Sequence, residues 1–186
     1  DPRTAPALIP DGTNDYVLDP SLPDSGEAIL NIRNVYDFDG AMVADAAALA
    51  DPVQTLAADR PARFVRIVKA VSQPHEDLLD IDNTAFGVSQ ANGMREIVGY
   101  GMIEPDGSVM IKVPANTALE VSILDRNGRR LPESSRHQSW INLRPGQYLQ
   151  CNGCHIPGDG MSHGRFDAFD SAYAGAQTPG ASFNDN

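Results

Sequence analysis

The feature that most constrains this sequence is a pair of cysteines two residues apart, followed at once by a histidine. The motif is Cys151-Asn152-Gly153-Cys154-His155, and it contains both cysteines of the chain. Two thiols at this spacing can each add to one vinyl group of a haem, because the two vinyls lie on neighbouring pyrroles. The next side chain then projects under the iron, where an imidazole nitrogen is a good ligand. The motif therefore predicts one covalent haem held by Cys151 and Cys154, with His155 as an axial iron ligand.

Other uses of a C-x-x-C motif need a context that this sequence does not provide. A thioredoxin-type redox site expects a βαβ setting with a helix after the first cysteine, but here Gly153 lies inside the motif and Pro157 follows it. A structural zinc site needs a second pair of ligands, and there is no second cysteine pair. A disulfide across two residues would be strained. We therefore expect a c-type cytochrome module carrying haem c. Such proteins are matured outside the cytoplasm, which implies a periplasmic or extracellular location.

The charge balance bears on possible partners. The formal net charge is −11, and an acidic surface repels phosphate backbones, so no nucleic-acid partner is expected. The same charge suits a basic redox partner protein, although many secreted proteins are simply acidic. No apolar run approaches the roughly 20 residues that span a bilayer, so no transmembrane segment is expected. The chain opens without a signal peptide, which fits either a mature protein or one part of a larger multidomain secreted protein.

Abundant Pro and Gly favour strands and turns over a helical bundle. We expect a mainly β protein, an antiparallel β-sandwich-like domain with a C-terminal haem-binding segment and few short helices. The predicted organisation is an extended N-terminal arm (1–26), a single β-rich haem domain (27–176, with the haem segment at about 137–170) and a flexible tail (177–186). Within the domain we predict strands at 28–35, 63–71, 95–103, 108–113 and 119–124, a turn at 37–40, and a short helix within 41–59, broken at Pro52.

A hairpin is predicted just before the motif. The segments 139–143 and 147–150 flank Arg144-Pro145-Gly146, which is typical of a turn. A tight turn there would place His137 opposite Cys154 and therefore beside the haem.

Several side chains are candidates for the remaining contacts with the haem. His163 is the first choice for the sixth iron ligand, because the glycines around it allow the loop to wrap around the haem edge. His137 is an alternative, as a distal ligand or a propionate partner, and Met161 would give His/Met ligation with a higher potential. His75 is expected to be a surface residue. Arg165 is a candidate partner of a haem propionate, although surface arginine is the commoner case.

Five short runs follow one another in the second half of the chain: EPDGSV (104–109), VPAN (113–116), LDRNG (124–128), RPG (144–146) and finally CNGCH (151–155). In these runs and their order, the region 95–160 resembles the haem-bearing part of hydrazine synthase alpha-subunit-like proteins. The resemblance implies a β-rich scaffold with a haem at its edge. It does not imply hydrazine synthesis, which in that family needs further haems and subunits. The family's tyrosine near the proximal histidine is also absent, because Ile156 to Asp159 follow His155.

The leading functional hypothesis is a mono-haem module that transfers electrons between extracytoplasmic redox partners, an electron carrier rather than a catalyst. No residue is assigned a catalytic role. The alternatives are a haem enzyme, peroxidase-like or acting on small nitrogen species, with His137 or His163 as acid–base group, and a gas-binding sensor with an open distal site.

Overall fold

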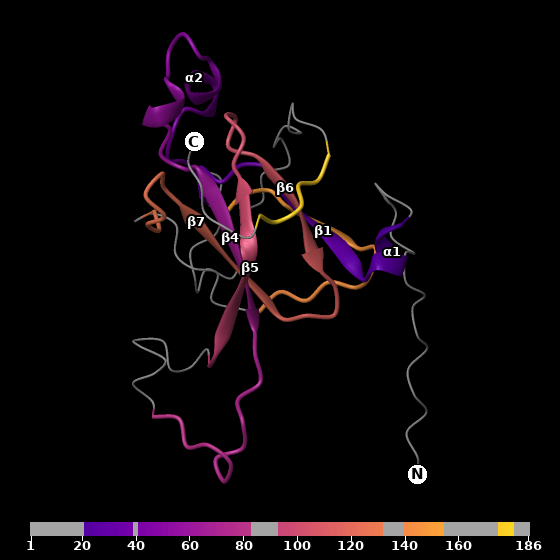
Figure 1. Ribbon diagram of the computed structural model, residues 1–186. Helices are drawn as coiled ribbons and strands as arrows, with labels where there is room; N and C mark the ends of the chain where they lie inside the picture. The colour runs from indigo at the N-terminus through magenta and orange to yellow at the C-terminus, as the bar shows by residue number, and fades with distance from the viewer. Residues whose placement is uncertain (1–20, 39–40, 83–92, 132–139, 155–174, 181–186) are drawn as a thin grey trace.

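The computed structural model describes residues 21–38, 41–82, 93–131, 140–154 and 175–180. These parts of the chain are mainly β with a few short helices, as the sequence predicted (Figure 1). In chain order the elements are α1 (Leu22–Ser25), β1 (Glu27–Ile32), β2 (Asp37–Phe38), β3 (Ala41–Met42), α2 (Ala46–Ala50), the 3-10 turn η1 (Ala57–Asp59), β4 (Phe64–Ala70), β5 (Arg95–Met102), β6 (Val109–Pro114), β7 (Leu119–Leu124) and β8 (Tyr148–Cys151).

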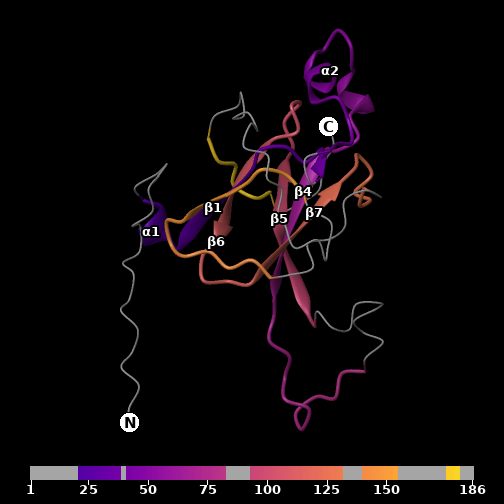
Figure 2. The same ribbon diagram turned by 180° about the vertical axis from the view of Figure 1, so that it is seen from behind.

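The longer strands lie where the sequence predicted them, and the one helix expected within 41–59 is α2. The Asp45 side chain accepts hydrogen bonds from the backbone amides of Ala47 and Ala48, both at 3.1 Å, which caps the start of this helix. The helix ends at Ala50, two residues before Pro52, because proline cannot continue it. Figure 2 shows α2 and the loop 71–82 projecting at opposite ends of the molecule.

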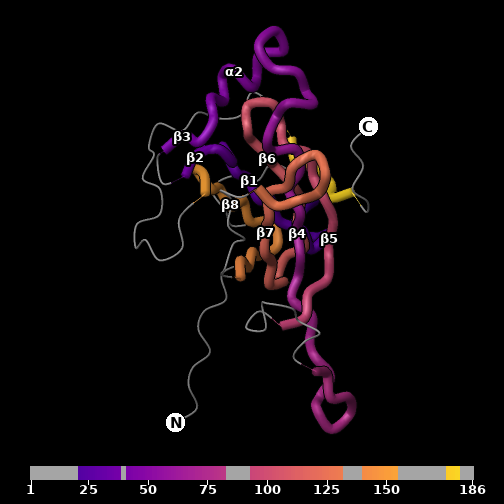
Figure 3. The backbone as a smooth tube through the Cα atoms, turned by 90° about the vertical axis from the view of Figure 1, so that its left-hand side faces the viewer, coloured from indigo at the N-terminus to yellow at the C-terminus, as the bar shows by residue number. Residues whose placement is uncertain are grey.

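Two three-stranded sheets form the body of the protein. In the first sheet, β4 is the central strand, and β5 and β7 both pair with it in antiparallel fashion. In the second sheet, β1 is the central strand, with β6 antiparallel on one side and β8 parallel on the other. Figure 3 shows β1 and β8 on one side of the molecule and β4, β5 and β7 on the other. The short hairpin of β2 and β3 forms a separate two-stranded ladder.

Both sheets contribute side chains to one hydrophobic core, which makes the arrangement sandwich-like. Leu30 of β1 and Ile111 of β6 belong to the same buried cluster as Val65 of β4 and Ile123 of β7. Burying each such aliphatic side chain contributes about 1.5–3 kcal/mol relative to its exposure. The alternation of buried and half-buried residues along β6 shows why its apolar face turns inward.

The predicted hairpin before the cysteine motif is wrong, although its turn is present. The amide of Gln147 donates to the carbonyl of Arg144 at 2.9 Å, and Gly146 has a φ of +75°. However, β8 pairs in parallel with β1. On the other side of the turn, Ile141 forms a bridge with Leu119 of the other sheet. The chain therefore crosses from one sheet to the other at this turn. The hairpin register that placed His137 opposite Cys154 no longer applies.

The parallel pairing has a physical reason: the edge of β1 offers backbone hydrogen-bond partners to the segment that contains β8. The amide of Gly146 donates to the carbonyl of Glu27 at 2.7 Å, and the amide of Ile29 donates to the carbonyl of Gln147 at 2.8 Å. This register also turns Leu149 and Cys151 toward the core. Satisfying the backbone and burying apolar side chains together favour the parallel pairing over a local hairpin.

Residues 177–180, expected to begin a flexible tail, are held against the sheets. The amide of Gln177 donates to the carbonyl of Met110 at 2.9 Å. Gly180 and Tyr100 exchange two backbone hydrogen bonds, at 2.7 and 3.0 Å. A Cβ on Gly99 would lie 2.7 Å from the carbonyl oxygen of Gly180, so glycine at this position allows the close approach. Gln177 and Gly180 therefore each form an isolated β-bridge, to Ile111 and to Tyr100.

Candidate functional site

Cys151 is the last residue of β8 and is fixed by the end of β1. It pairs with Ile32, and its carbonyl oxygen accepts a hydrogen bond from the amide of Arg33 at 2.9 Å. Its side chain is half-buried and packs against the hydrophobic core, as does that of Leu149. Burial raises the pKa of the Cys151 thiol above its ordinary value, because the thiolate loses solvation. The folded chain therefore presents this sulfur in its neutral form.

Cys154 is fixed by the start of β2. Its amide donates to the carbonyl oxygen of Asp37 at 2.7 Å, and it forms an isolated parallel bridge with Phe38. Its thiol lies 3.9 Å from the carbonyl oxygen of Val35, within reach of a weak S–H hydrogen bond. Both cysteines are thus held by the stretch 32–38 that joins β1 to β2.

Gly153 is buried where the motif passes closest to this stretch. A Cβ at this position would lie 2.8 Å from the Asp37 Cβ and 3.2 Å from the carbonyl oxygen of Asn34. Real Cβ atoms are essentially never found closer than 3.0 Å to another heavy atom, so a larger residue would push the motif away from β2. The glycine in the motif is therefore a requirement of packing. This contact could not be predicted, because it links residues that are far apart in the chain. At 37–40 the sequence predicted only a turn.

The chemistry of these side chains fits haem attachment. Cys151 and Cys154 share no disulfide in the described part of the chain, and each retains a thiol able to form a thioether. Among the described residues, no group of three or more His, Cys, Asp or Glu side chains is placed to hold a metal ion. The donor set consists of two anchored thiols with an imidazole next in sequence, which is the set that haem c requires.

The other predicted site residues fall into two groups. His155, His137, His163, Arg165 and Met161 lie outside the described residues. His75 lies on the exposed loop 71–82, where its Nδ1 is 3.3 Å from Oδ2 of Asp77 and its side chain is 69 % exposed. The prediction that His75 is a surface residue is confirmed.

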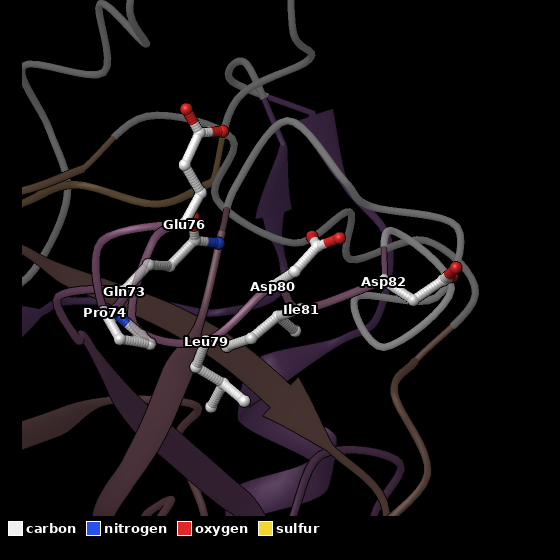
Figure 4. A pocket seen from close by; sticks show the side chains of 7 residues that line it. All are labelled: Gln73, Pro74, Glu76, Leu79, Asp80, Ile81 and Asp82. Carbon is white, nitrogen blue, oxygen red and sulfur yellow. The ribbon is translucent and has the colours of Figure 1, made fainter.

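A hollow of about 520 Å³ lies on the same loop. Figure 4 shows that the carboxylates of Glu76, Asp80 and Asp82 point away from one another, so they do not converge on a single ligand. The loop also projects away from the two sheets (Figure 1). The cysteine motif is therefore the better candidate site.

Together the fold and the site define a class of protein: a sandwich-like β domain in which the two cysteines of a C-x-x-C-H motif are anchored at the edge of one sheet. The family model of the hydrazine synthase alpha subunit middle domain matches residues 61–156, and the chain belongs to this family. The match covers β4 to β8 and ends one residue after the motif.

Hydrazine synthase from Kuenenia stuttgartiensis is similar in structure, with a TM-score of 0.50 and 22% sequence identity. The similarity covers 70% of this chain and 17% of that chain, so this chain corresponds to a small part of the larger protein. No curated protein sequence matches the chain. In the described parts of the chain, no helix is long and apolar enough to cross a bilayer.

Proposed function

We propose that this chain is a mono-haem c module that passes electrons between redox partner proteins in the periplasm or outside the cell. Cys151 and Cys154 would hold the haem covalently, and His155 would be one axial ligand of the iron. The observation that carries the proposal is that both cysteines retain thiols and are fixed by main-chain hydrogen bonds to the same stretch, 32–38.

Of the chain's own groups, only the two cysteine thiols react when the haem is attached. Each S–H adds across one vinyl double bond, so that sulfur bonds to one carbon and the proton to the other. When bound, the haem supplies an iron that cycles between ferrous and ferric states. The stretch 32–38 would keep the two thioether sulfurs in place during that cycle, and a rigid attachment suits electron transfer because little has to reorganise.

The family match, and the small share of hydrazine synthase that this chain covers, support a proposal about the whole protein. The structure that resembles this chain is named as hydrazine synthase, and this chain spans 17% of it. We therefore propose that the chain functions as one module of a larger multidomain secreted protein. The net charge of −11 would favour association with a basic redox partner.

The test is to produce the chain in a bacterial periplasm that carries a cytochrome c maturation system. Intact mass should rise by one haem, and the pyridine haemochrome spectrum should be that of two thioether bonds. The wild-type protein should titrate reversibly as a one-electron couple. A Cys151→Ala/Cys154→Ala double variant should carry no covalent haem. A chain that matures without haem, or that copurifies with zinc, would rule out the proposal.

Family membership also favours a second candidate, a haem enzyme acting on small nitrogen species, because the family is named after an enzyme. This candidate requires an open distal position on the iron. A high-spin ferric spectrum and immediate cyanide binding would support the enzyme and contradict the electron carrier. A low-spin spectrum that resists cyanide would support the electron carrier.

A further inference from the structure

The turn 104–107 joins β5 to β6 and begins the run EPDGSV, which has no role in the site described above. The amide of Gly107 donates to the carbonyl of Glu104 at 2.9 Å, and the amide of Glu104 donates to the carbonyl of Ser108 at 2.8 Å. The Asp106 carboxylate also accepts from the amide and the hydroxyl of Ser108, at 2.9 and 2.6 Å. The turn is therefore firmly shaped by its own residues.

Gly107 packs tightly against the stretch 34–37. Its carbonyl oxygen accepts a hydrogen bond from the amide of Val35 at 2.8 Å. A Cβ on Gly107 would lie 2.7 Å from Oδ1 of Asn34 and 2.7 Å from Cδ2 of the buried Tyr36 ring. Its φ of +85° is also one that residues with a Cβ rarely adopt. Both the backbone and the packing thus require glycine at this position.

The same stretch also contacts the cysteine motif. The side-chain oxygen of Asn34 lies against Gly107, whereas its carbonyl oxygen lies against Gly153, 3.2 Å from where a Cβ would be. The amide of Val35 is bonded to Gly107, and its carbonyl oxygen lies 3.9 Å from Sγ of Cys154. One residue therefore separates the turn from the sulfur of Cys154.

The stretch has little freedom to absorb a displacement. Oδ1 of Asn34 accepts from the amide of Tyr36 at 2.9 Å, and the carbonyl of Asn34 accepts from the amide of Asp37 at 3.3 Å, which together form an Asx turn. The Tyr36 hydroxyl oxygen accepts from the amide of the buried Ala62 at 3.2 Å. Close-packed interiors transmit strain, so a shift at Gly107 should reach the motif.

We propose that Gly107 is a positioning residue of the haem site: the turn 104–107 sets the position of Cys154 through the stretch 34–37. The inference rests on the proposed function for its role in haem attachment, since Gly107 is argued to act only through Cys154. Cys151 is held differently, by pairing with Ile32 at the end of β1. The turn should therefore control one thioether and not the other.

The experiment measures how fast iodoacetamide alkylates each cysteine in the haem-free full chain, with the two sites resolved by mass spectrometry. In Gly107→Ala the rate at Cys154 should rise about tenfold relative to the rate at Cys151, as expected if local opening at Cys154 is favoured by about 1.4 kcal/mol. Global destabilisation would raise both rates together, so the ratio of the two rates isolates the positioning effect.

Gly26→Ala is the matched control. Gly26 also has a positive φ, +70°, but a Cβ there meets nothing within 4 Å. This variant should strain the backbone in the same way and leave the ratio of the two rates at its wild-type value.

Gly107→Asn separates backbone strain from the contact. Asparagine accepts a positive φ more readily than alanine but carries the same Cβ, so its ratio should rise as in Gly107→Ala. If it instead matched the wild type, strain alone would explain the effect and the inference would be wrong.

Asn34 provides a second, milder test that does not depend on the folding of the Gly107 variants. Asn34→Ala removes the acceptor of the Tyr36 amide, so the ratio should rise, by less than in Gly107→Ala. Asn34→Asp keeps an oxygen in the same place and should restore a ratio close to that of the wild type. An unchanged ratio in Asn34→Ala would contradict the inference.

The matured protein supplies the last measurement. Gly107→Ala should carry haem bonded through Cys151 alone in a larger fraction of molecules than the wild type, measured by peptide mass and by a pyridine haemochrome spectrum of single-thioether type. Two intact thioethers in this variant would overturn the inference. A wild type that carries no haem would contradict the proposed function, whereas the alkylation rates, measured without haem, would still decide whether Gly107 positions Cys154.

Discussion

The amide of Cys154 donates a hydrogen bond to the carbonyl oxygen of Asp37 at 2.7 Å, and this bond ties the end of the cysteine motif to β2. The other end is tied in the same way, because the carbonyl of Cys151 accepts from the Arg33 amide at 2.9 Å. The turn between the two cysteines is therefore already shaped by the protein. A turn that is shaped in advance would present both sulfurs at the spacing that the two vinyl groups require.

Replacing Gly153 by alanine should disturb this attachment. The added Cβ would lie 2.8 Å from the Asp37 Cβ, in a place where both neighbours are held by the backbone. Overpacking of this kind costs about 1–3 kcal/mol. We expect a lower yield of covalent haem, measured by intact mass, and a lower free energy of unfolding of the haem-free protein.

The control for this variant is Gly175→Ala. Gly175 has a φ of +89°, so alanine there strains the backbone, but the new Cβ meets nothing within 4 Å. This variant should lose stability without loss of haem attachment. Equal attachment in Gly153→Ala and Gly175→Ala would mean that the contact with Asp37 does not position the motif.

The buried thiol of Cys151 predicts a dependence of stability on pH in the haem-free protein. Burial raises the pKa of this thiol, whereas the unfolded chain has the ordinary value of about 8.5. Below that value both states are protonated, so this contribution to stability is fully present. As the pH rises from there through the folded pKa, only the unfolded state ionises at first, and stability is lost.

Urea denaturation of the haem-free protein between neutral and alkaline pH measures this effect. Cys151→Ala should show a smaller loss of stability with rising pH than the wild type. In the wild type, Cys151 should also react more slowly than Cys154 with an alkylating reagent at mildly alkaline pH. A faster reaction at Cys151 would contradict the burial of its sulfur.

Much of the β structure could be predicted because its signals are local. The strand segments predicted at 95–103, 108–113 and 119–124 located β5, β6 and β7, and Pro52 bounded the short helix predicted within 41–59. The cysteine motif could be recognised because the chemistry of attachment dictates its spacing. The parallel partner of β8 could not be predicted, because a Pro-Gly turn favours a hairpin locally while the free edge of β1 lies far away in sequence. Contacts such as Gly153 with Asp37 depend on that same pairing, so they were hidden for the same reason.

The Gln177 side chain should prove important for holding the segment 177–180. Its Oε1 accepts from the Met102 amide at 2.9 Å and its Nε2 donates to the Met102 carbonyl at 2.7 Å. Because each such bond contributes about 0.5–1.5 kcal/mol, Gln177→Ala should destabilise the protein by roughly 1–2 kcal/mol. Amide hydrogen exchange at Met102 and Lys112 should also become faster, since the Lys112 amide donates to the Gln177 carbonyl.

The exposed neighbour Thr178 supplies the control for this prediction. Thr178→Ala should change neither the unfolding free energy nor the exchange at Met102. If Gln177→Ala behaved like Thr178→Ala in both measurements, the segment would not be held by this side chain.

Two ion pairs in the β4-centred sheet should differ sharply in their contribution to stability. Arg95 Nε lies 3.4 Å from Oε2 of Glu120, with side chains 21 % and 2 % exposed. The Arg95 guanidinium also lies 6.0 Å from the ring centre of Trp140. Lys69 and Glu96 form a pair of similar length, 3.2 Å, but with side chains 35 % and 57 % exposed. Removing one partner from a buried pair leaves a charge with poor solvation, whereas water replaces the partner in an exposed pair.

Arg95→Ala should therefore lower the free energy of unfolding by about 3–5 kcal/mol, and Lys69→Ala by at most about 1 kcal/mol. Adding Glu120→Gln to Arg95→Ala should recover part of the loss, because the buried carboxylate is then neutral. Chemical denaturation of the three variants at neutral pH measures these differences. Equal effects of Arg95→Ala and Lys69→Ala, or no recovery in the double variant, would mean that the buried charge of Glu120 does not depend on Arg95.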